Sequence, residues 1–269
     1  MSYYEKLPES IYWNVGEHRV HLACAAPLVA GRRTLLAVHG AGGSAWVWGE
    51  LGSRLAGKFN FAAIELPGHG ASEGPALTDI GSMVAVVAGA AERLVSSAQT
   101  PPPIVMGHSM GGAISIDLAL SGAAELSGLV LVATGARLKV QPTIIEGIES
   151  NWEASCRSEE GFGPEAPREL KDAYASDRVQ GSPGVAASDF RACNVFDRMA
   201  DLGRITLPTL VFGGGKDLLT PEKYARYLSE RIPGAKLVIL ENAGHMLPIE
   251  EPGILAAQLD AHFPDTSNE

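Results

Sequence analysis

The sequence predicts an α/β protein: a doubly wound, mostly parallel sheet with an inserted helical cap. Short apolar runs recur along the chain with helical patterns between them, and several of these runs lack the polar alternation of a half-solvated strand. Strands that alternate with helices favour parallel pairing, with helices on both faces of the sheet. Between residues 136 and 203 the strand-like runs vanish and a mainly helical, more charged texture replaces them.

The expected strands are short segments rich in valine, leucine, isoleucine and alanine, bounded by glycine, proline or charged residues. In chain order they cover residues 19–26, 34–38, 60–64, 104–106, 129–133, 209–212 and 236–240. The segments between them have the longer apolar periodicity of helices. Helices are expected at residues 82–95, 111–120, 221–231 and 253–261.

The expected cap is an insertion between two parts of one core. The core comprises residues 1–135 and 204–269, and the cap comprises residues 136–203. Within the cap, Thr143 and Glu146 resemble a capping box that begins a helix running through Trp152. Ser182 and Pro183 are a second helix-start signal.

One face of the second cap helix has apolar residues at three-residue steps. They are Phe190, Cys193, Phe196 and Met199. Such a stripe either forms the core of the cap or provides a wall that faces a substrate, and the pattern leaves both interpretations open.

Composition excludes several classes of protein. The chain has 269 residues, enough for one large domain with an insertion, and its formal net charge is −10. Nucleic-acid binding needs clustered Lys and Arg, so an acidic chain argues against it. No secretory signal is visible near the first residues, and the longest apolar stretch, Met83 to Ala91, is too short to span a membrane. We therefore expect a cytoplasmic protein with no membrane span.

The cysteines do not indicate a disulfide framework or a metal site. Cys24, Cys156 and Cys193 are widely spaced, odd in number and outside any CxxC pair. We expect them to be reduced, buried thiols, and we expect no metal ion.

The segment Gly107-His-Ser-Met-Gly-Gly112 carries the strongest chemical signal. It has the pattern G-x-S-x-G between an expected strand and an expected helix, which is the context of a nucleophile elbow. A tight strand-to-helix turn excludes β-carbons on either side and exposes the hydroxyl of Ser109. The start of the following helix directs positive backbone N–H groups towards any anion that forms there.

A serine nucleophile needs a base, and the base needs an acid that orients it. Asp217 follows a late strand in a glycine-rich turn, and His245 follows the next strand after a small residue. The order Ser109, Asp217, His245 is the order that this elbow requires, and it leaves room for the cap between nucleophile and acid.

Other residues fit these roles less well. His18 and His21 lie in an early strand and His262 lies near the C-terminus, so none of them follows a late strand. Glu241 is too close in sequence to His245 to come from a separate strand end. His39, His69 and His108 lie in glycine-rich turns, where a structural hydrogen bond to the backbone is expected.

The segment His39-Gly-Ala-Gly-Gly-Ser44 admits two interpretations. It mimics a dinucleotide-binding fingerprint, with Glu65 as the ribose-binding acid, which would make the protein an oxidoreductase. It also fits a loop that supplies one N–H group to an oxyanion hole, in which case the backbone N–H groups of Ala41 and Met110 would bind the oxyanion. The second interpretation is favoured because it predicts the downstream serine, acid and histidine.

These motifs together resemble the α/β-hydrolase superfamily. The resemblance rests on HGAGGS at 39–44, PGHGAS at 67–72, GHSMGG at 107–112, the turn at 213–217 and AGH at 243–245. It covers nearly the whole chain apart from the cap. It implies a doubly wound sheet with a lid, acyl transfer without a cofactor, and Ser109, Asp217 and His245 as nucleophile, acid and base. A serine at the elbow departs from the aspartate nucleophile of dehalogenases and epoxide hydrolases.

The function expected is a serine hydrolase that cleaves a small to medium carboxylic ester through an acyl-enzyme. A carbon–carbon bond hydrolase, a lactonase or a thioesterase could use the same triad, and a non-catalytic ligand-binding protein could share the fold. The partner is thus a small molecule, while the oligomeric state is not predicted. The candidate residues of the substrate pocket are Trp46, Trp48, Met110, Trp152, Phe196 and Met246, although core packing is the more common role of such side chains.

Overall fold

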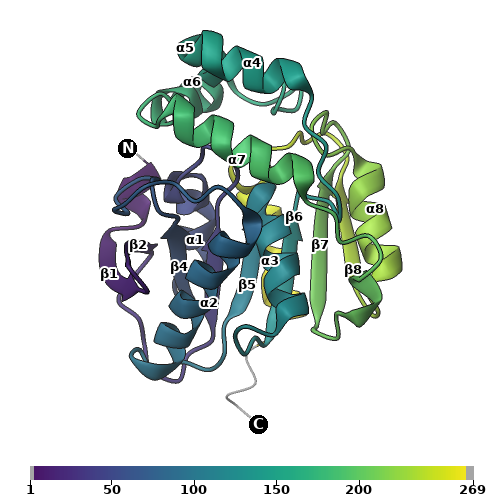
Figure 1. Ribbon diagram of the computed structural model, residues 1–269. Helices are drawn as coiled ribbons and strands as arrows, with labels where there is room; N and C mark the ends of the chain where they lie inside the picture. The colour runs from purple at the N-terminus through teal and green to yellow at the C-terminus, as the bar shows by residue number, and fades with distance from the viewer. Residues whose placement is uncertain (1–2, 265–269) are drawn as a thin grey trace.

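A computed structural model describes residues 3–264 of the chain. Its centre is an eight-stranded sheet in the order β1-β2-β4-β3-β5-β6-β7-β8 (Figure 1). The strands are β1 Glu9–Val15, β2 His18–Cys24, β3 Thr34–Val38, β4 Asn60–Glu65, β5 Ile104–His108, β6 Gly128–Val132, β7 Thr209–Gly214 and β8 Lys236–Leu240. Strands β3 to β8 pair in parallel, whereas β1 and β2 are antiparallel additions at one edge. The predicted mostly parallel sheet is therefore confirmed.

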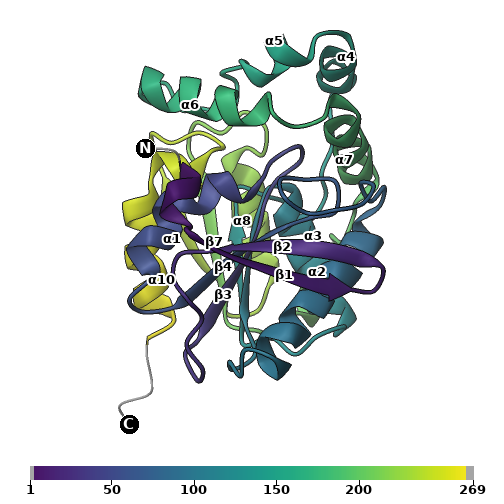
Figure 2. The same ribbon diagram turned by 90° about the vertical axis from the view of Figure 1, so that its left-hand side faces the viewer.

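Helices cover both faces of the sheet (Figure 2). The core helices α1, α9 and α10 share one hydrophobic cluster, and α2, α3 and α8 share the cluster on the other face. Their bounds are α1 Gly49–Leu55, α2 Ile80–Ser96, α3 Met110–Ser121, α8 Glu222–Arg231, α9 Leu247–Glu250 and α10 Pro252–His262, with 3-10 turns η1 Tyr3–Lys6, η2 Ala45–Trp48 and η3 Leu202–Arg204. Strands β3 to β7 are buried at every position, because both faces are covered.

Four further helices lie above the end of the sheet where the parallel strands finish (Figure 1). They are α4 Pro142–Ser150, α5 Trp152–Cys156, α6 Arg168–Arg178 and α7 Pro183–Val195. The chain enters and leaves this region at neighbouring points, because Arg137 and Asp197 form an antiparallel bridge and the Arg198 N–H donates to the Ala136 carbonyl. The division into a core and a cap of residues 136–203 stays a prediction, with which this bridge is consistent.

Strand β1 and helices α1 and α9 of the core were not predicted from the sequence. Strand β1 alternates exposed and half-buried residues at the sheet edge, so its apolar residues never form a continuous run. Helix α1 begins directly after the 3-10 turn η2 and is only seven residues long. Strand β1 is too mixed in polarity to show a continuous apolar run, and α1 and the four-residue α9 are too short to show helical periodicity.

The start of the first cap helix differs from the prediction. Pro142 occupies the first helical position and Gln141 is the N-cap, so Thr143 lies inside the helix and the capping box is wrong. The helix also ends at Ser150 rather than Trp152. The side chain of Asn151 accepts a hydrogen bond from the Ala154 N–H and begins a separate helix.

The second cap helix begins as predicted, with Ser182 as N-cap and Pro183 in the first position. Its apolar stripe is shorter than expected because the helix ends at Val195. Phe196 is the residue after the helix and is buried, while Met199 lies beyond it and is exposed.

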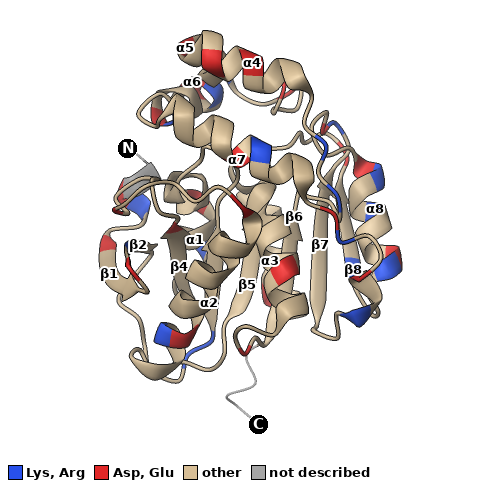
Figure 3. Cartoon of the chain, viewed as in Figure 1, with Lys and Arg blue, Asp and Glu red and all other residues tan. Residues whose placement is uncertain are grey.

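Charged residues of both signs are mixed along the helices seen in Figure 3, for example along α8. Within residues 3–264, every helix is too short or too polar to cross a lipid bilayer.

Candidate active site

Ser109 lies in the tight turn between β5 and α3. Its backbone φ is 54°, a left-handed conformation that is uncommon for a residue with a β-carbon. Hydrogen bonds hold the turn on both sides: the Ser109 N–H donates to the Val132 carbonyl, and the Thr134 hydroxyl donates to the Ser109 carbonyl at 2.7 Å. Strain at one residue, held by its surroundings, is typical of a functional position.

The glycines of the elbow are required by close backbone contacts. A β-carbon on Gly107 would lie 2.1 Å from the Gly111 carbonyl oxygen, and one on Gly111 would lie 2.2 Å from the Val38 carbonyl oxygen. Both distances are far below van der Waals contact with an immovable backbone atom. Helix α3 can therefore approach β3 and β5 closely enough to form the elbow only because these residues lack side chains.

Asp217 follows β7 and is held by a dense set of donors. Its Oδ1 accepts hydrogen bonds from the backbone N–H groups of Leu219 and Thr220, each at 2.8 Å, and its Oδ2 accepts one from the Thr220 hydroxyl at 2.7 Å. Burial alone would raise the pKa of the Asp217 carboxyl, but attraction to His245 and the hydrogen bonds from His245 and Thr220 lower this pKa below its ordinary value. Asp217 is therefore an ionised carboxylate at neutral pH.

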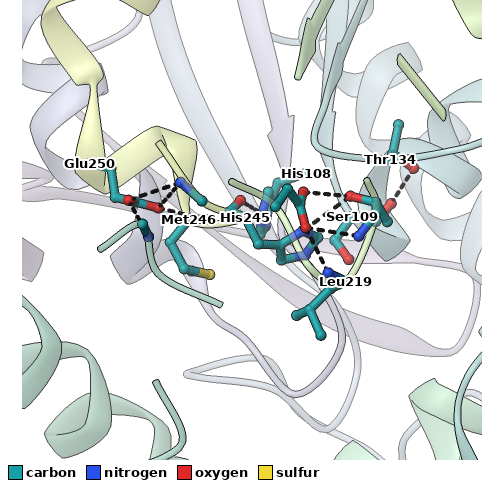
Figure 4. A network of polar contacts seen from close by, with 11 residues as sticks. His108, Ser109, Thr134, Leu219, His245, Met246 and Glu250 are labelled. Carbon is teal, nitrogen blue, oxygen red and sulfur yellow. Dashed lines mark hydrogen bonds and ion pairs between the residues drawn. The ribbon is translucent and has the colours of Figure 1, made fainter. Parts of the chain in front are cut away.

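His245 follows β8 and contacts this carboxylate. Its Nδ1 lies 2.9 Å from Asp217 Oδ2. An ionised carboxylate only accepts hydrogen bonds, so Nδ1 carries the proton and Nε2 of a neutral ring has a free lone pair. Ser109 and His245 line the same cavity, and Figure 4 shows them grouped with His108. The structure thus brings together the three residues that the sequence assigns to the triad, whose roles stay a prediction.

Thr220 is a polar residue of the site that the sequence analysis missed. Its hydroxyl lies between the acid and the base, 2.7 Å from Asp217 Oδ2 and 3.1 Å from His245 Nδ1. The signal was present, because a carboxylate three residues before a threonine, followed by Pro221 and a helix, is typical of a side-chain-capped turn.

The backbone around His245 is fixed from three directions. His108 donates a hydrogen bond from Nε2 to the His245 carbonyl at 2.9 Å, and the His245 N–H donates to the Gly161 carbonyl at 2.8 Å. Glu250 accepts hydrogen bonds from the N–H groups of Gly244 and Met246 (Figure 4), and also from Gly163. Because Gly161 and Gly163 belong to the segment between α5 and α6, the region above the sheet takes part in positioning the base.

His108 is a neutral support rather than a second base. Burial and repulsion from His245 lower the pKa of His108 to about 3. His39 and His69 also donate or accept hydrogen bonds at backbone atoms, namely the Gly40 carbonyl, the Leu66 N–H and the Pro67 carbonyl. The structural role predicted for these three histidines is therefore confirmed.

The backbone N–H groups of Ala41 and Met110 are the two donors proposed for the oxyanion hole. Among residues 3–264, neither the Ala41 N–H nor the Met110 N–H donates a hydrogen bond to another protein group. Ala41 lines the cavity beside Ser109, whereas the Met110 side chain is buried in the core and leaves only its backbone for this role. Two free donors beside a nucleophile suit an oxyanion, and this role stays a prediction.

The dinucleotide interpretation of the HGAGGS segment does not fit the structure. Glu65 has no exposed surface, and its carboxylate accepts hydrogen bonds from the N–H groups of Ala45 and Ala71 and contacts His21 at 2.9 Å. A carboxylate already used by the protein in this way is not available to a ribose hydroxyl. Glu241, the other candidate acid, is exposed and is not bonded to His245.

The cavity above Ser109 has a volume of about 310 Å³. Of the predicted wall residues, only Met246 lines it. Trp46 and Trp48 are buried in the core with α1, and Met110 and Phe196 are buried in the core on the other face. Trp152 packs inside the helical region above the sheet. The side chains of these five residues pack in hydrophobic clusters and do not line the cavity.

Most of the remaining wall residues were not singled out from the sequence, and Phe190 is the exception. They include Val47, Ile144, Ile148, Phe162, Tyr174, Arg178, Phe190 and Leu219. Most lie between residues 136 and 203, so their position depends on how that region docks on the sheet. Phe190 was predicted as part of an apolar stripe, and it does face the cavity.

The cysteines are free and buried, as predicted. Burial raises the pKa of Cys24 to about 12 and also raises the pKa of Cys193, so these thiols are unreactive at neutral pH. Within the described part of the chain, no group of three or more His, Cys, Asp or Glu residues is arranged to hold a metal ion.

A strained serine at the end of a central strand, a histidine hydrogen-bonded to a buried carboxylate and a cavity above them are an arrangement typical of hydrolases of the α/β class. A family model described as the alpha/beta hydrolase family matches residues 35–258, and the chain belongs to this family. The predicted resemblance is thereby confirmed.

Several curated proteins are similar to this chain. A pimeloyl-(acyl-carrier protein) methyl ester esterase of Nitrosomonas europaea is 25% identical over 251 residues, covering 84% of this chain and 94% of the relative. An uncharacterized hydrolase, YugF, of Bacillus subtilis is 28% identical over 251 residues, covering 85% and 89% of the two chains.

Solved structures show the same fold. A thermophilic esterase superimposes with a TM-score of 0.78 at 28% identity, over 94% of this chain and 98% of that one. An enol-lactonase of Burkholderia xenovorans LB400 superimposes with a TM-score of 0.83 at 21% identity, over 95% of this chain and all of the other. At that identity the second likeness concerns the fold alone.

Proposed function

We propose that this protein is a serine esterase that hydrolyses small to medium carboxylic esters through an acyl-enzyme intermediate. The observation that carries the proposal is the hydrogen bond between His245 Nδ1 and the Asp217 carboxylate, in a cavity that Ser109 also lines. The similarity to proteins named as esterases supports an ester as the substrate.

The reaction follows from the geometry in two steps. His245 Nε2 takes the proton of the Ser109 hydroxyl as its oxygen attacks the ester carbonyl carbon, and Asp217 stabilises the resulting imidazolium. The N–H groups of Ala41 and Met110 bind the oxyanion, and His245 returns the proton to the alcohol that leaves. Water, deprotonated by the same His245, then attacks the acyl-enzyme and releases the carboxylic acid.

The size of the cavity supports small to medium substrates. A volume of about 310 Å³ is at the lower end of the range for ligand pockets. The walls include the apolar side chains of Val47, Phe162, Phe190 and Leu219, which suit an alkyl or aryl group. A cytoplasmic location stays a prediction from the sequence.

Turnover of p-nitrophenyl esters of increasing chain length tests the proposal. Ser109→Ala is expected to lower kcat by about 10⁵-fold or more, because no other group replaces the nucleophile. Ser121→Ala is the matched control, since Ser121 ends the same helix α3, lies outside the cavity, and its hydroxyl donates to the Leu118 carbonyl and accepts from the Ala123 N–H. If Ser109→Ala retains wild-type turnover while staying folded, the proposal is wrong.

Parallel assays with lactones, thioesters and β-diketones separate the other reactions that the same triad supports. A preference of at least tenfold in kcat/KM for one of these over the best ester would replace the esterase assignment. Tight binding of esters by the wild-type protein without turnover would instead indicate a ligand-binding protein on this fold.

A further inference from the structure

Arg178 is the basic side chain that lines the catalytic cavity. It is the last residue of α6, and it also borders a second cavity of about 330 Å³ lined by Ser44, His69 and Asp177. Arg178 therefore borders both the cavity above Ser109 and this second cavity. The mechanism proposed above makes no use of this arginine.

The charge of Arg178 is not balanced by a direct ion pair. Among residues 3–264, no carboxylate lies within salt-bridge distance of Arg178, although every other arginine in the upper helices, for example Arg157 and Arg168, has such a partner. The adjacent Asp177 accepts a hydrogen bond from the Ser44 hydroxyl, and burial raises the pKa of that carboxyl to about 6.

Arg178 is nevertheless held firmly in place. Its guanidinium donates a hydrogen bond to the Tyr174 hydroxyl at 3.2 Å and lies over the Trp152 ring at 5.6 Å. Its Nε atom is excluded from solvent and has no hydrogen-bond partner among the described residues. A buried donor left without an acceptor is costly, and at a ligand cavity it indicates a group that the ligand supplies.

We propose that Arg178 binds a carboxylate of the substrate, so that the preferred esters are half-esters of dicarboxylic acids or other esters that carry a free carboxylate. The inference rests on the proposed esterase function and names its substrate class. A guanidinium matches a carboxylate in planar shape and offers paired N–H donors. The apolar walls contact the chain between the two ends, the ester at Ser109 and the carboxylate at Arg178.

The experiment compares each monomethyl ester of succinic, glutaric, adipic and suberic acid with the dimethyl ester of the same acid. The wild-type protein is expected to prefer the monoester at one chain length. Arg178→Met is expected to lower kcat/KM for that monoester on the order of 10- to 100-fold, mainly through KM, and to change the diester less than about threefold. Arg178→Lys keeps the charge and is expected to restore part of the preference.

Arg157→Met is the matched control. Arg157 has the same charge on the neighbouring helix end, but it is exposed and paired with Glu153 outside the cavity. It should leave the ratio of monoester to diester turnover unchanged, which separates local binding from general attraction of anions. An equal loss on both esters in Arg178→Met, or no monoester preference in the wild type at any length, overturns the inference.

Calorimetry on Ser109→Ala removes the dependence on turnover. The ligand is the monomethyl ester of the preferred chain length, or monomethyl adipate if no ester is hydrolysed. It should bind Ser109→Ala at least tenfold more tightly than it binds the double variant that combines Ser109→Ala with Arg178→Met. Absence of this difference overturns the carboxylate site. Hydrolysis of neutral esters alone, without discrimination, leaves the esterase function standing and rejects only the role of Arg178.

Discussion

The Asp217 carboxylate accepts hydrogen bonds from two backbone N–H groups, one hydroxyl and His245. Because these contacts lower its pKa below the ordinary value of 3.8, the ionised form stabilises the folded state. The unfolded chain binds this proton first as the pH falls. The stabilisation is therefore fully present above the unfolded pKa and is lost as the pH decreases through the lower folded pKa.

Asp217→Asn tests this linkage. The variant should unfold with a free energy about 1–3 kcal/mol below the wild type at pH 5, because a charge-assisted network is lost. The difference should narrow between pH 5 and pH 2.5, because the unfolded wild-type chain takes up the proton of this carboxyl in that range while the folded protein, whose Asp217 pKa is lowered, does not. Urea unfolding of both proteins at the two pH values measures it, and a difference that stays constant or grows on acidification contradicts the assignment.

At the residue scale, the sequence was sufficient to propose the three residues whose side-chain types a serine hydrolase mechanism requires. Ser109, Asp217 and His245 each follow a strand, and parallel strands end at one edge of the sheet, so order and spacing were sufficient to propose them. Thr220 and Arg178 were missed for different reasons. Thr220 lies in a local turn whose sequence resembles that of any capped turn. Arg178 is distinguished only by the absence, among the described residues, of a carboxylate partner and of an acceptor for its Nε, which the sequence cannot reveal.

Helix α7 is joined to the core by a buried pair. Asp189 of α7 has no exposed surface, and its Oδ2 accepts hydrogen bonds from the Gly42 N–H and from His69 Nε2, both at 2.8 Å. Burial alone would lower the pKa of His69, but the bond and attraction to Asp189 raise it above its ordinary value. Gly42 follows Ala41, so this pair also fixes the loop of the proposed oxyanion hole.

Asp189→Asn should separate helix α7 from that loop. The expected loss is about 3 kcal/mol in the free energy of unfolding, because one partner of a buried pair is removed, together with a fall in the pKa of His69 measured by NMR titration. Asp172→Asn is the control, since Asp172 forms an exposed pair with Arg168 on α6 and should cost about 1 kcal/mol or less. Equal losses in the two variants would show that Asp189 has no special role.

At the element scale, length and polarity decided what could be predicted. Helices α2, α3, α8 and α10 and the seven strands β2 to β8 carry continuous or periodic apolar patterns, and each was found within a few residues. Edge strand β1 has no such pattern because one of its edges and part of its faces contact water. The start of α4 was misplaced because the pair Thr143 and Glu146 competes with Pro142, and a proline at the first helical position prevails.

The molecule combines a large core with a thinner layer above it. Two extensive hydrophobic clusters cover the faces of the sheet, while a third cluster, between α4 and α7, contains only Ile148, Ala186 and Ala187 as buried members. Local opening requires little free energy where few apolar contacts are lost. Helix α4, whose one buried residue, Ile148, belongs to the third cluster, should therefore open without unfolding of the core.

Native-state hydrogen exchange measures this difference. Amides of α4 are expected to exchange with an opening free energy several kcal/mol below that of β3 and β5, which should exchange only through global unfolding. A half-ester bound in the cavity should slow exchange in α4 and α6. Equal opening free energies for α4 and β5 would contradict the picture of a separate layer.

At the scale of the whole molecule, the way in which this layer packs on the sheet could not be predicted from the sequence. Two of its four helices were recognisable, while α5 and α6 were not singled out. The contacts of these helices with the sheet depend on tertiary pairs such as Gly161 with His245 and Asp189 with His69. No local pattern encodes a pair so distant along the chain. The cavity wall was therefore largely unpredicted, whereas the reactive residues beneath it were not.

The central claim is that Asp217 and His245 activate Ser109 as a nucleophile, and covalent trapping tests it most directly. Wild-type protein incubated with a fluorophosphonate should gain the mass of one adduct, and peptide mapping should place it on Ser109, with labelling slowed strongly in His245→Ala and absent in Ser109→Ala. An adduct on another residue, or no adduct on folded wild-type protein, would contradict the account.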